Sequence, residues 1–244
     1  MQPRFVGRLG LADAVTVTNA AVGFAAAVLA TVDAGLAARL VLFGAIADGL
    51  DGVVARKRGS TPVGSYLDSL ADVASFGVAP AMVVAVRALD AASFGAGTGG
   101  SSADLALAAA AVVVPAVYVA MAVTRLGMYT AYDTDHDETE GVPTTLAATI
   151  LAAAVLAGYT NPILLLAVTA VFAGLMVSTI TYPDLHPQDA LVMGLVQAAT
   201  VLTPGFWGRV FAFALLFLAA GYLILGPRFY WREGLGSGSS PVEG

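Results

Sequence analysis

Residues 48–56 read DGLDGVVAR and residues 64–72 read GSYLDSLAD, and both stretches combine acidic and small residues. They place four carboxylates within sequence that is otherwise apolar enough for a membrane: Asp48, Asp51, Asp68 and Asp72. Ionised groups at membrane depth are costly, so they persist where they face a wet cavity, pair with opposite charges or bind ions. Four carboxylates so close together indicate a cation site built into a bilayer.

The composition is that of an integral membrane protein. Of the 244 residues, 58% are hydrophobic and 11% are charged, and the mean hydropathy is +0.83. Soluble domains are roughly half apolar and about a quarter charged. The chain has no cysteine, which excludes disulfides and thiolate metal sites and leaves oxygen atoms as metal ligands. The net charge of −6 argues against nucleic acid as a partner.

The apolar segments predict an all-α fold, a polytopic transmembrane helical bundle of about eight helices, with six or seven crossings as the alternative. The expected helices cover residues 15–32, 36–55, 67–89, 103–123, 142–158, 162–180, 190–202 and 206–225. We expect a single domain over residues 1–233 and a disordered, Gly/Ser-rich tail over residues 234–244.

The distribution of basic residues predicts the orientation of this bundle. With the N-terminus inside, eight arginines and lysines fall at cytoplasmic ends, and three fall outside: Arg39, Arg87 and Arg209. Cytoplasmic loops carry the excess of Lys and Arg in membrane proteins. We therefore expect a multi-pass protein of the cell membrane whose N-terminus and carboxylate site face the cytoplasm.

Helical spacing predicts that the carboxylates converge. At about 100° per residue, two sets each share one helix face: Asp48, Asp51, Gly52 and Ala55 in the first helix, and Gly64, Ser65, Asp68 and Asp72 in the second. The link over residues 57–62 is short enough to make the two helices antiparallel neighbours. All four carboxylates can then meet.

The residues between the carboxylates favour a diphosphate ligand. Small side chains at Gly52, Ala55 and Gly64 leave room for a bulky ligand, and Arg56 lies at the edge of the acidic face, where it can pair with phosphate. Oxygen ligands favour Mg²⁺ or Mn²⁺ over zinc, and two ions about 3.5–4 Å apart would suit in-line attack on phosphorus. The alternative is a divalent-cation or proton-coupled transporter, since acidic residues in membrane helices also line ion pathways.

The pattern DxxDGxxAR followed by GxxxDxxxD resembles the signature of the CDP-alcohol phosphotransferases, which are integral membrane enzymes. Eight fixed residues match over 25 positions. Further stretches are similar to the phosphatidylserine synthase and archaetidylserine synthase branch of that family: Thr18-Asn19, residues 75–80 (SFGVAP), Arg125-Leu126, residues 141–143 (GVP) and residues 176–180 (MVSTI).

This resemblance implies an activity. A phosphatidyl-type group, on an ester or an archaeal ether lipid, would pass from a CDP-linked lipid to the hydroxyl of L-serine, with release of CMP. Glycerol phosphate or inositol phosphate is the alternative acceptor. The acidic chain with its single lysine, Lys57, favours the archaeal lipid. The family also implies a homodimer in contact with membrane lipids.

The resemblance assigns roles residue by residue. Asp48, Asp51, Asp68 and Asp72 would hold two Mg²⁺ or Mn²⁺ ions, and Asp72 would be the catalytic base. The nucleotide-binding set would be Asp48, Gly52, Ala55, Arg56, Gly64, Ser65 and Asp68. Arg125, expected at the cytoplasmic end of the fourth helix, would pair with the serine carboxylate, and the alternative is an arginine that only sets topology.

Overall fold

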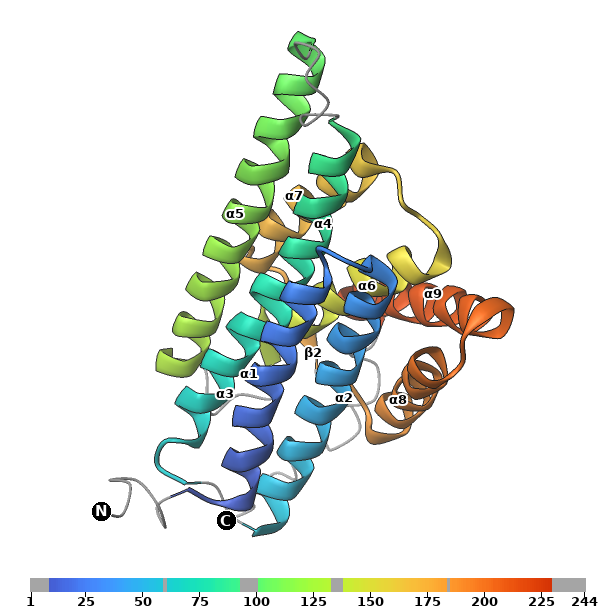
Figure 1. Ribbon diagram of the computed structural model, residues 1–244. Helices are drawn as coiled ribbons and strands as arrows, with labels where there is room; N and C mark the ends of the chain where they lie inside the picture. The colour runs from blue at the N-terminus through green and yellow to red at the C-terminus, as the bar shows by residue number, and fades with distance from the viewer. Residues whose placement is uncertain (1–8, 59–60, 93–100, 133–137, 184, 230–244) are drawn as a thin grey trace, which may run out of the picture.

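The computed structural model describes residues 9–58, 61–92, 101–132, 138–183 and 185–229, without the side chains of residues 51–58, 138, 187 and 229 (Figure 1). The predicted disordered tail over residues 234–244 lies outside this part. The elements in chain order are α1 (Leu11–Leu29), α2 (Ala34–Arg58), α3 (Gly64–Asp72), the π-helical turn η1 (Val73–Val78), α4 (Ala79–Ala91), α5 (Ser102–Tyr132), β1 (Glu138–Glu140), α6 (Thr144–Ala157), α7 (Pro162–Met176), β2 (Thr181–Pro183), α8 (Pro187–Leu202) and α9 (Gly205–Phe229).

The predicted all-α membrane bundle is confirmed. Because α3, η1 and α4 form one continuous helix, the described residues contain eight helical segments, one for each predicted helix. Four are long and apolar enough to cross a membrane: Leu11–Leu29, Gly64–Ala91, Ser102–Tyr132 and Gly205–Arg228. Helix α2 spans 25 residues, but its charges keep it out of this group. The chain is a multi-pass membrane protein.

Local hydrogen bonds explain several helix ends. The Asp13 carboxylate accepts a hydrogen bond of 2.7 Å from the backbone N–H of Gly10, so α1 begins before the predicted Val15. Asn161 caps α7 by accepting a hydrogen bond from the backbone N–H of Leu164 at 3.0 Å. Gly158 follows α6 with a φ of 98°, a left-handed conformation that suits glycine and ends the helix.

Two predicted helix ends are wrong, and one of them changes the place of a predicted site residue. Helix α7 ends at Met176 instead of Ile180, and Thr181–Pro183, just beyond the predicted helix, forms the short strand β2. This strand pairs antiparallel with β1, and neither strand was predicted. Helix α5 continues to Tyr132, beyond the predicted end at Val123, so Arg125 lies inside a helix and not at its end.

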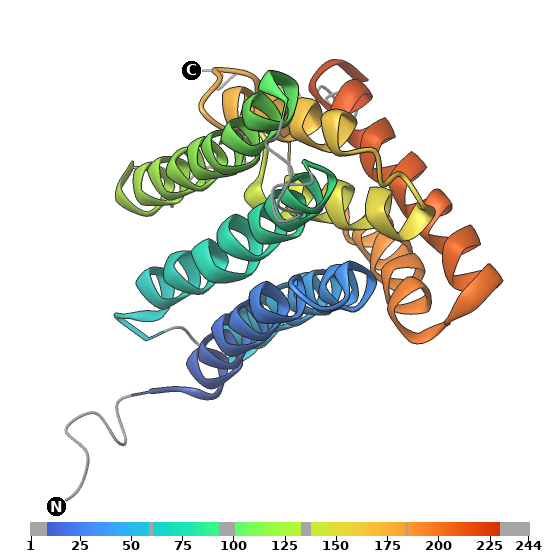
Figure 2. The same cartoon turned by 45° about the horizontal axis from the view of Figure 1, so that its top comes forward.

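Helix α1 contacts both helices that carry the acidic residues. It packs against α2 on one side and against α3, η1 and α4 on the other. Figures 1 and 2 show α5 at one edge of the molecule and the α8–α9 pair at the opposite edge. The largest fully buried side chains are Tyr118, Phe76, Leu42, Leu151 and Leu165. This packing fixes α1, η1 and α5 relative to one another.

Three arginines were predicted to lie on the outer side of the membrane, and two of them donate hydrogen bonds to carbonyls at helix C-termini. The Arg39 guanidinium donates to the carbonyls of Thr200 and Val201 at 2.8 Å and to that of Thr203 at 3.1 Å, at the end of α8. Arg209 Nε donates to the carbonyl of Ala157 at 2.8 Å, at the end of α6. Cations satisfy terminal carbonyls and oppose the negative end of the helix dipole. Both side chains therefore stabilise the ends of neighbouring helices.

Candidate metal centre

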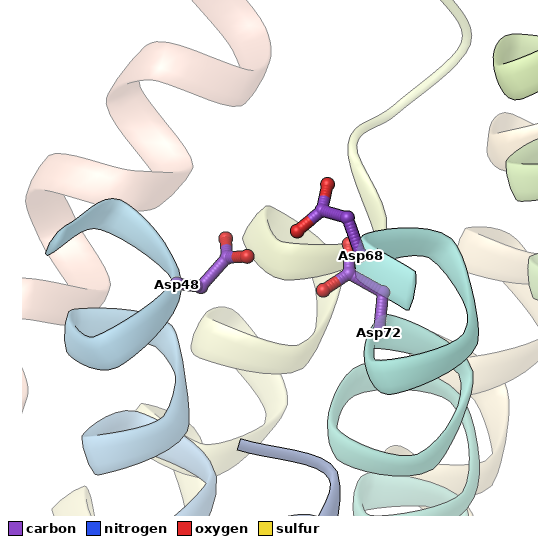
Figure 3. Close-up of side chains that lie close together, drawn as sticks. All are labelled: Asp48, Asp68 and Asp72. Atoms are coloured by element: carbon purple, nitrogen blue, oxygen red, sulfur yellow. The ribbon is translucent and has the colours of Figure 1, made fainter. Parts of the chain in front are cut away.

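Three of the four predicted carboxylates come together. Asp48 projects from α2 toward Asp68 and Asp72, which lie one turn apart on α3 (Figure 3). One carboxylate oxygen from each lies within 4.8 Å of the other two. The predicted convergence of these three side chains is confirmed, and the side chain of Asp51, three residues beyond Asp48, lies outside the described residues.

The three carboxylates differ in how deeply they are buried in the bundle. Asp72 is only 7% exposed, Asp48 is half-buried, and Asp68 is partly exposed. All the side-chain ligands in this cluster are negatively charged carboxylate oxygens, which are the ligands that Mg²⁺ and Mn²⁺ prefer. The residues therefore fit a divalent cation, held between two helices that the chain joins by a short connector.

The residues predicted to bind nucleotide are only partly described. Gly64 is the first residue of α3 and is half-buried, and Ser65 beside it is exposed. Both lie one turn before Asp68 on the way into the site. The side chains of the remaining predicted residues on α2 lie outside the described part: Gly52, Ala55 and Arg56.

Helix α1 sets the spacing between the two helices that carry the carboxylates. A Cβ at Gly44, one turn before Asp48, would lie 2.8 Å from Asn19 Oδ1 of α1. A Cβ at Gly23 would lie 2.6 Å from Ser75 Oγ, three residues after Asp72. Such distances exclude a side chain at either glycine without movement, so α1 approaches both α2 and η1 through glycine. Asn19 is 1% exposed and its carbonyl accepts a hydrogen bond of 2.9 Å from Ser75 Oγ.

Helix α5 brings Arg125 to the same end of the bundle. The hydroxyls of Ser69 in α3 and Thr130 in α5 are hydrogen bonded, which joins α5 to the turn between Asp68 and Asp72. The Arg125 guanidinium lies 5.8 Å from the centre of the Tyr129 ring, within cation–π range. This arginine therefore stands on a helix anchored directly to the acidic turn.

The connector between the two motif halves is tied to α1. Thr61 Oγ1 donates to the Asp13 carboxylate, with separations of 2.9 Å and 3.1 Å to the two oxygens. Asp13 is only 2% exposed. Sequence reasoning did not single out Asp13, because a single acidic residue at a helix start is common and its partner lies 48 residues away.

Comparison with known proteins identifies the family. A sequence profile of the CDP-alcohol phosphatidyltransferase family matches residues 9–181, more than two thirds of the chain. The chain belongs to this family. Archaetidylserine synthase of Methanothermobacter thermautotrophicus is 28% identical over 187 residues, which cover 75% of this chain and 73% of the relative. The CDP-diacylglycerol–serine O-phosphatidyltransferase of Methanocaldococcus jannaschii is 41% identical over 75 residues, 30% of this chain and 34% of the relative.

As a CDP-alcohol phosphatidyltransferase, the chain is a transferase of phospholipid biosynthesis, and the transporter alternative is wrong. Enzymes of this family generally depend on divalent metal. The matched region covers α1 through α7 and ends at the first residue of β2, so it contains the acidic cluster, the glycine contacts of α1 and the α5 helix that carries Arg125.

Proposed function

We propose that this CDP-alcohol phosphatidyltransferase transfers a phosphatidyl-type group from a CDP-linked lipid to the hydroxyl of L-serine and releases CMP. The names of both relatives, one a serine phosphatidyltransferase and one an archaetidylserine synthase, support serine as the acceptor. The observation that carries the proposal is the convergence of Asp48, Asp68 and Asp72 from two helices onto one oxygen-lined site. One domain over residues 1–233 would contain this activity.

The acidic residues would hold the metal. Asp48, Asp51, Asp68 and Asp72 would bind two Mg²⁺ or Mn²⁺ ions, and the three described carboxylates already lie close enough to share a ligand sphere. When bound, such ions neutralise the negative charge that builds up on a diphosphate as its P–O bond breaks. The residues of the site would bind and orient the two substrates, and one of them would accept a proton.

The nucleotide would lie where the two motif halves meet. Asp48, Gly52, Ala55, Arg56, Gly64, Ser65 and Asp68 would line the pocket for the CDP group, with Arg56 paired to phosphate. The exposure of Ser65 at the start of α3, one turn before Asp68, supports a ligand that enters from this end of the bundle. Small residues there leave the backbone accessible to a planar base.

Asp72 would act as the base. Its carboxylate accepts the proton of the serine hydroxyl as the serine oxygen attacks the lipid-side phosphorus, and the bond from that phosphorus to the CMP oxygen breaks. Burial of Asp72 inside the bundle supports this role, because water that is kept away from the carboxylate cannot accept the serine proton in its place. A positioned base contributes a rate factor of roughly 10² to 10⁴.

Arg125 would bind the carboxylate of the serine acceptor. A guanidinium recognises a carboxylate through two parallel hydrogen bonds, which also orients the acceptor. The hydrogen bond between Ser69 and Thr130 supports the proposal, since it holds α5 against the turn that carries Asp68 and Asp72.

The wider setting follows from the same proposal. The active site and the N-terminus would face the cytoplasm of the cell membrane, and the enzyme would act as a homodimer among membrane lipids. The name of the Methanothermobacter relative favours the ether lipid over the ester lipid as donor.

The test is an assay of CMP release by purified protein with Mg²⁺ or Mn²⁺, CDP-archaeol or CDP-diacylglycerol, and a panel of alcohols. We expect release that depends on L-serine and on metal, and a loss of about 10² or more in Asp72→Asn. Glycerol phosphate or inositol phosphate as the preferred acceptor would overturn the serine assignment. Equal release by wild type and Asp72→Asn would overturn the role of Asp72.

A further inference from the structure

The helix that carries Asp68 and Asp72 contains a single π-helical turn directly after Asp72. This turn, η1, covers Val73–Val78, between α3 and α4 of one continuous helix. A π-turn adds one residue to an α-helix and is frequent at functional sites. One added residue rotates the helix before it by about 100° relative to the helix after it. The direction in which α3 presents its carboxylates therefore depends on η1.

Helix α4 gives this rotation a fixed reference. Its side chains at Val83, Val84 and Ala88 are at most 3% exposed and belong to the hydrophobic core. The rotation produced by η1 must therefore appear in α3, which has fewer buried residues: of its nine, only Ala71 and Asp72 are buried. In a regular α-helix through this region, the face with Asp68 and Asp72 would point about 100° away from its present direction toward Asp48.

Pro80 explains why the helix departs from regular geometry at this place. In an α-helix residue 80 would donate its N–H to the carbonyl of Phe76, but proline has no N–H and its ring crowds that carbonyl. The hydroxyl of Tyr118 in α5 donates to the Phe76 carbonyl instead, at 2.9 Å. Tyr118 and Phe76 are both 0% exposed, so water cannot replace this hydrogen bond.

The opposite side of η1 is held by α1. Ser75 Oγ donates to the carbonyl of Asn19 at 2.9 Å, and Gly23 leaves no space for Ser75 to move toward α1. Gly77 faces α5, where an added Cβ would meet Ala122 Cβ at 3.6 Å. The turn is thus fixed from α1 through Ser75 and from α5 through Phe76.

We propose that η1 is the element that turns Asp68 and Asp72 toward Asp48, and that Tyr118 is the positioning residue that holds it. This inference rests on the proposed function, because it assumes that the three carboxylates share a cation. Tyr118 itself does not touch the site. Its hydroxyl acts through the Phe76 carbonyl, which keeps the helix in the π-helical register and so keeps the cation ligands of α3 in place.

The test measures Mn²⁺ binding by electron paramagnetic resonance, without substrate, in wild type and Tyr118→Phe. The control is Tyr222→Phe, which also removes a tyrosine hydroxyl that donates to a backbone carbonyl, that of Pro183 at 2.6 Å, far from η1. We expect Tyr118→Phe to weaken Mn²⁺ binding at least tenfold and Tyr222→Phe to change it less than twofold. Equal Mn²⁺ affinity in wild type and Tyr118→Phe would overturn the inference.

Pro80→Ala keeps the proposal testable if Tyr118→Phe does not fold. Alanine restores the N–H donor to Phe76 and permits a regular α-helix. We expect this variant to be at least as resistant to heat as wild type and yet to bind Mn²⁺ at least tenfold more weakly. Undiminished Mn²⁺ affinity in Pro80→Ala would also overturn the inference.

A distance measurement separates rotation of α3 from general loosening. The chain has no cysteine, so spin labels at Gly49→Cys in α2 and Leu70→Cys in α3 report on this pair of helices alone. We expect Tyr118→Phe to shift the distance distribution to a new narrow maximum, and an unchanged distribution contradicts the proposal. If wild type binds no Mn²⁺, or Asp72→Asn binds it as wild type does, the proposed cation site fails and the inference fails with it.

Discussion

The hydroxyl of Thr61 donates a hydrogen bond of 2.9 Å to the buried carboxylate of Asp13. Thr61 belongs to the connector between the two halves of the acidic motif, and Asp13 lies in the first turn of α1. The bond therefore fixes the connector to the same helix that, about two to three turns further on, contacts α2 through Asn19 and η1 through Gly23. Helix α1 therefore contacts the connector, α2 and η1, the three segments next to the candidate metal centre.

Thr61→Val should loosen this connector. Valine keeps the shape of threonine but leaves the buried carboxylate with one donor fewer, so we expect the free energy of unfolding to fall by about 1–3 kcal/mol. The KM for the CDP-lipid should rise because the connector joins the predicted nucleotide-binding residues. Unfolding by SDS in mixed micelles and initial-rate kinetics measure the two effects. Thr124→Val is the matched control, since that exposed hydroxyl bonds only to its own helix, at Ala120.

Gly23→Ala should push α1 away from η1. The added Cβ would meet Ser75 Oγ at 2.6 Å and the Ser75 backbone at 2.7 Å, so one of the two helices must move. Overpacking of this kind costs about 1–3 kcal/mol of unfolding free energy. Gly221→Ala in α9 is the control, because nothing lies within 4 Å of its Cβ position and alanine favours helix by about 0.5–1 kcal/mol. Equal stability of the two variants would contradict the close contact.

Arg39→Gln should destabilise the fold without changing the chemistry. The variant removes a charged donor from three carbonyls at the end of α8, which we expect to cost about 1.5–3 kcal/mol of unfolding free energy. The CMP release rate per folded molecule should stay at the wild-type value. Arg228→Gln, at an exposed position in the last turn of α9, should change stability by about 0.5 kcal/mol or less. A loss of rate in folded Arg39→Gln would indicate a role in the site.

Arg125→Ala should raise the KM for serine with a smaller effect on the KM for the CDP-lipid. The guanidinium is proposed to bind the serine carboxylate, and loss of a bidentate charged contact weakens binding by about tenfold or more. Initial rates at varied serine concentration measure the effect, with Arg228→Ala as the control. An unchanged serine KM would leave Arg125 with a topological role alone.

The convergence of the carboxylates was predictable because helical periodicity is local. Asp68 and Asp72 are four residues apart, so they share a face in any α-helix, and the short connector limits how far α2 and α3 can separate. The eight helices were equally predictable from apolar runs, apart from their ends. The end of α5 was missed because polar residues follow Val123 although the helix continues to Tyr132.

The π-turn and the β1–β2 pair could not be predicted in the same way, because both depend on contacts between distant residues. Pro80 was a visible signal for irregular helix geometry. The donor that replaces its missing N–H is Tyr118, 38 positions later in the chain, and no spacing rule connects the two. Likewise, Thr181–Pro183 forms a strand only because Glu138–Glu140 lies beside it. The predicted helix over residues 162–180 ends before this strand, and local sequence gave no sign of the pairing that forms it.

We propose that Asp48, Asp68 and Asp72 form one divalent-cation site between α2 and α3. Titration of the purified enzyme with Mn²⁺, followed by electron paramagnetic resonance, measures binding at this site. The three Asp→Asn variants should each bind Mn²⁺ at least tenfold more weakly than wild type, since each loses a charged ligand. Asp33→Asn, whose exposed side chain caps α2, should bind as wild type does. Wild-type Mn²⁺ affinity in all three site variants would show that these carboxylates do not hold the cation.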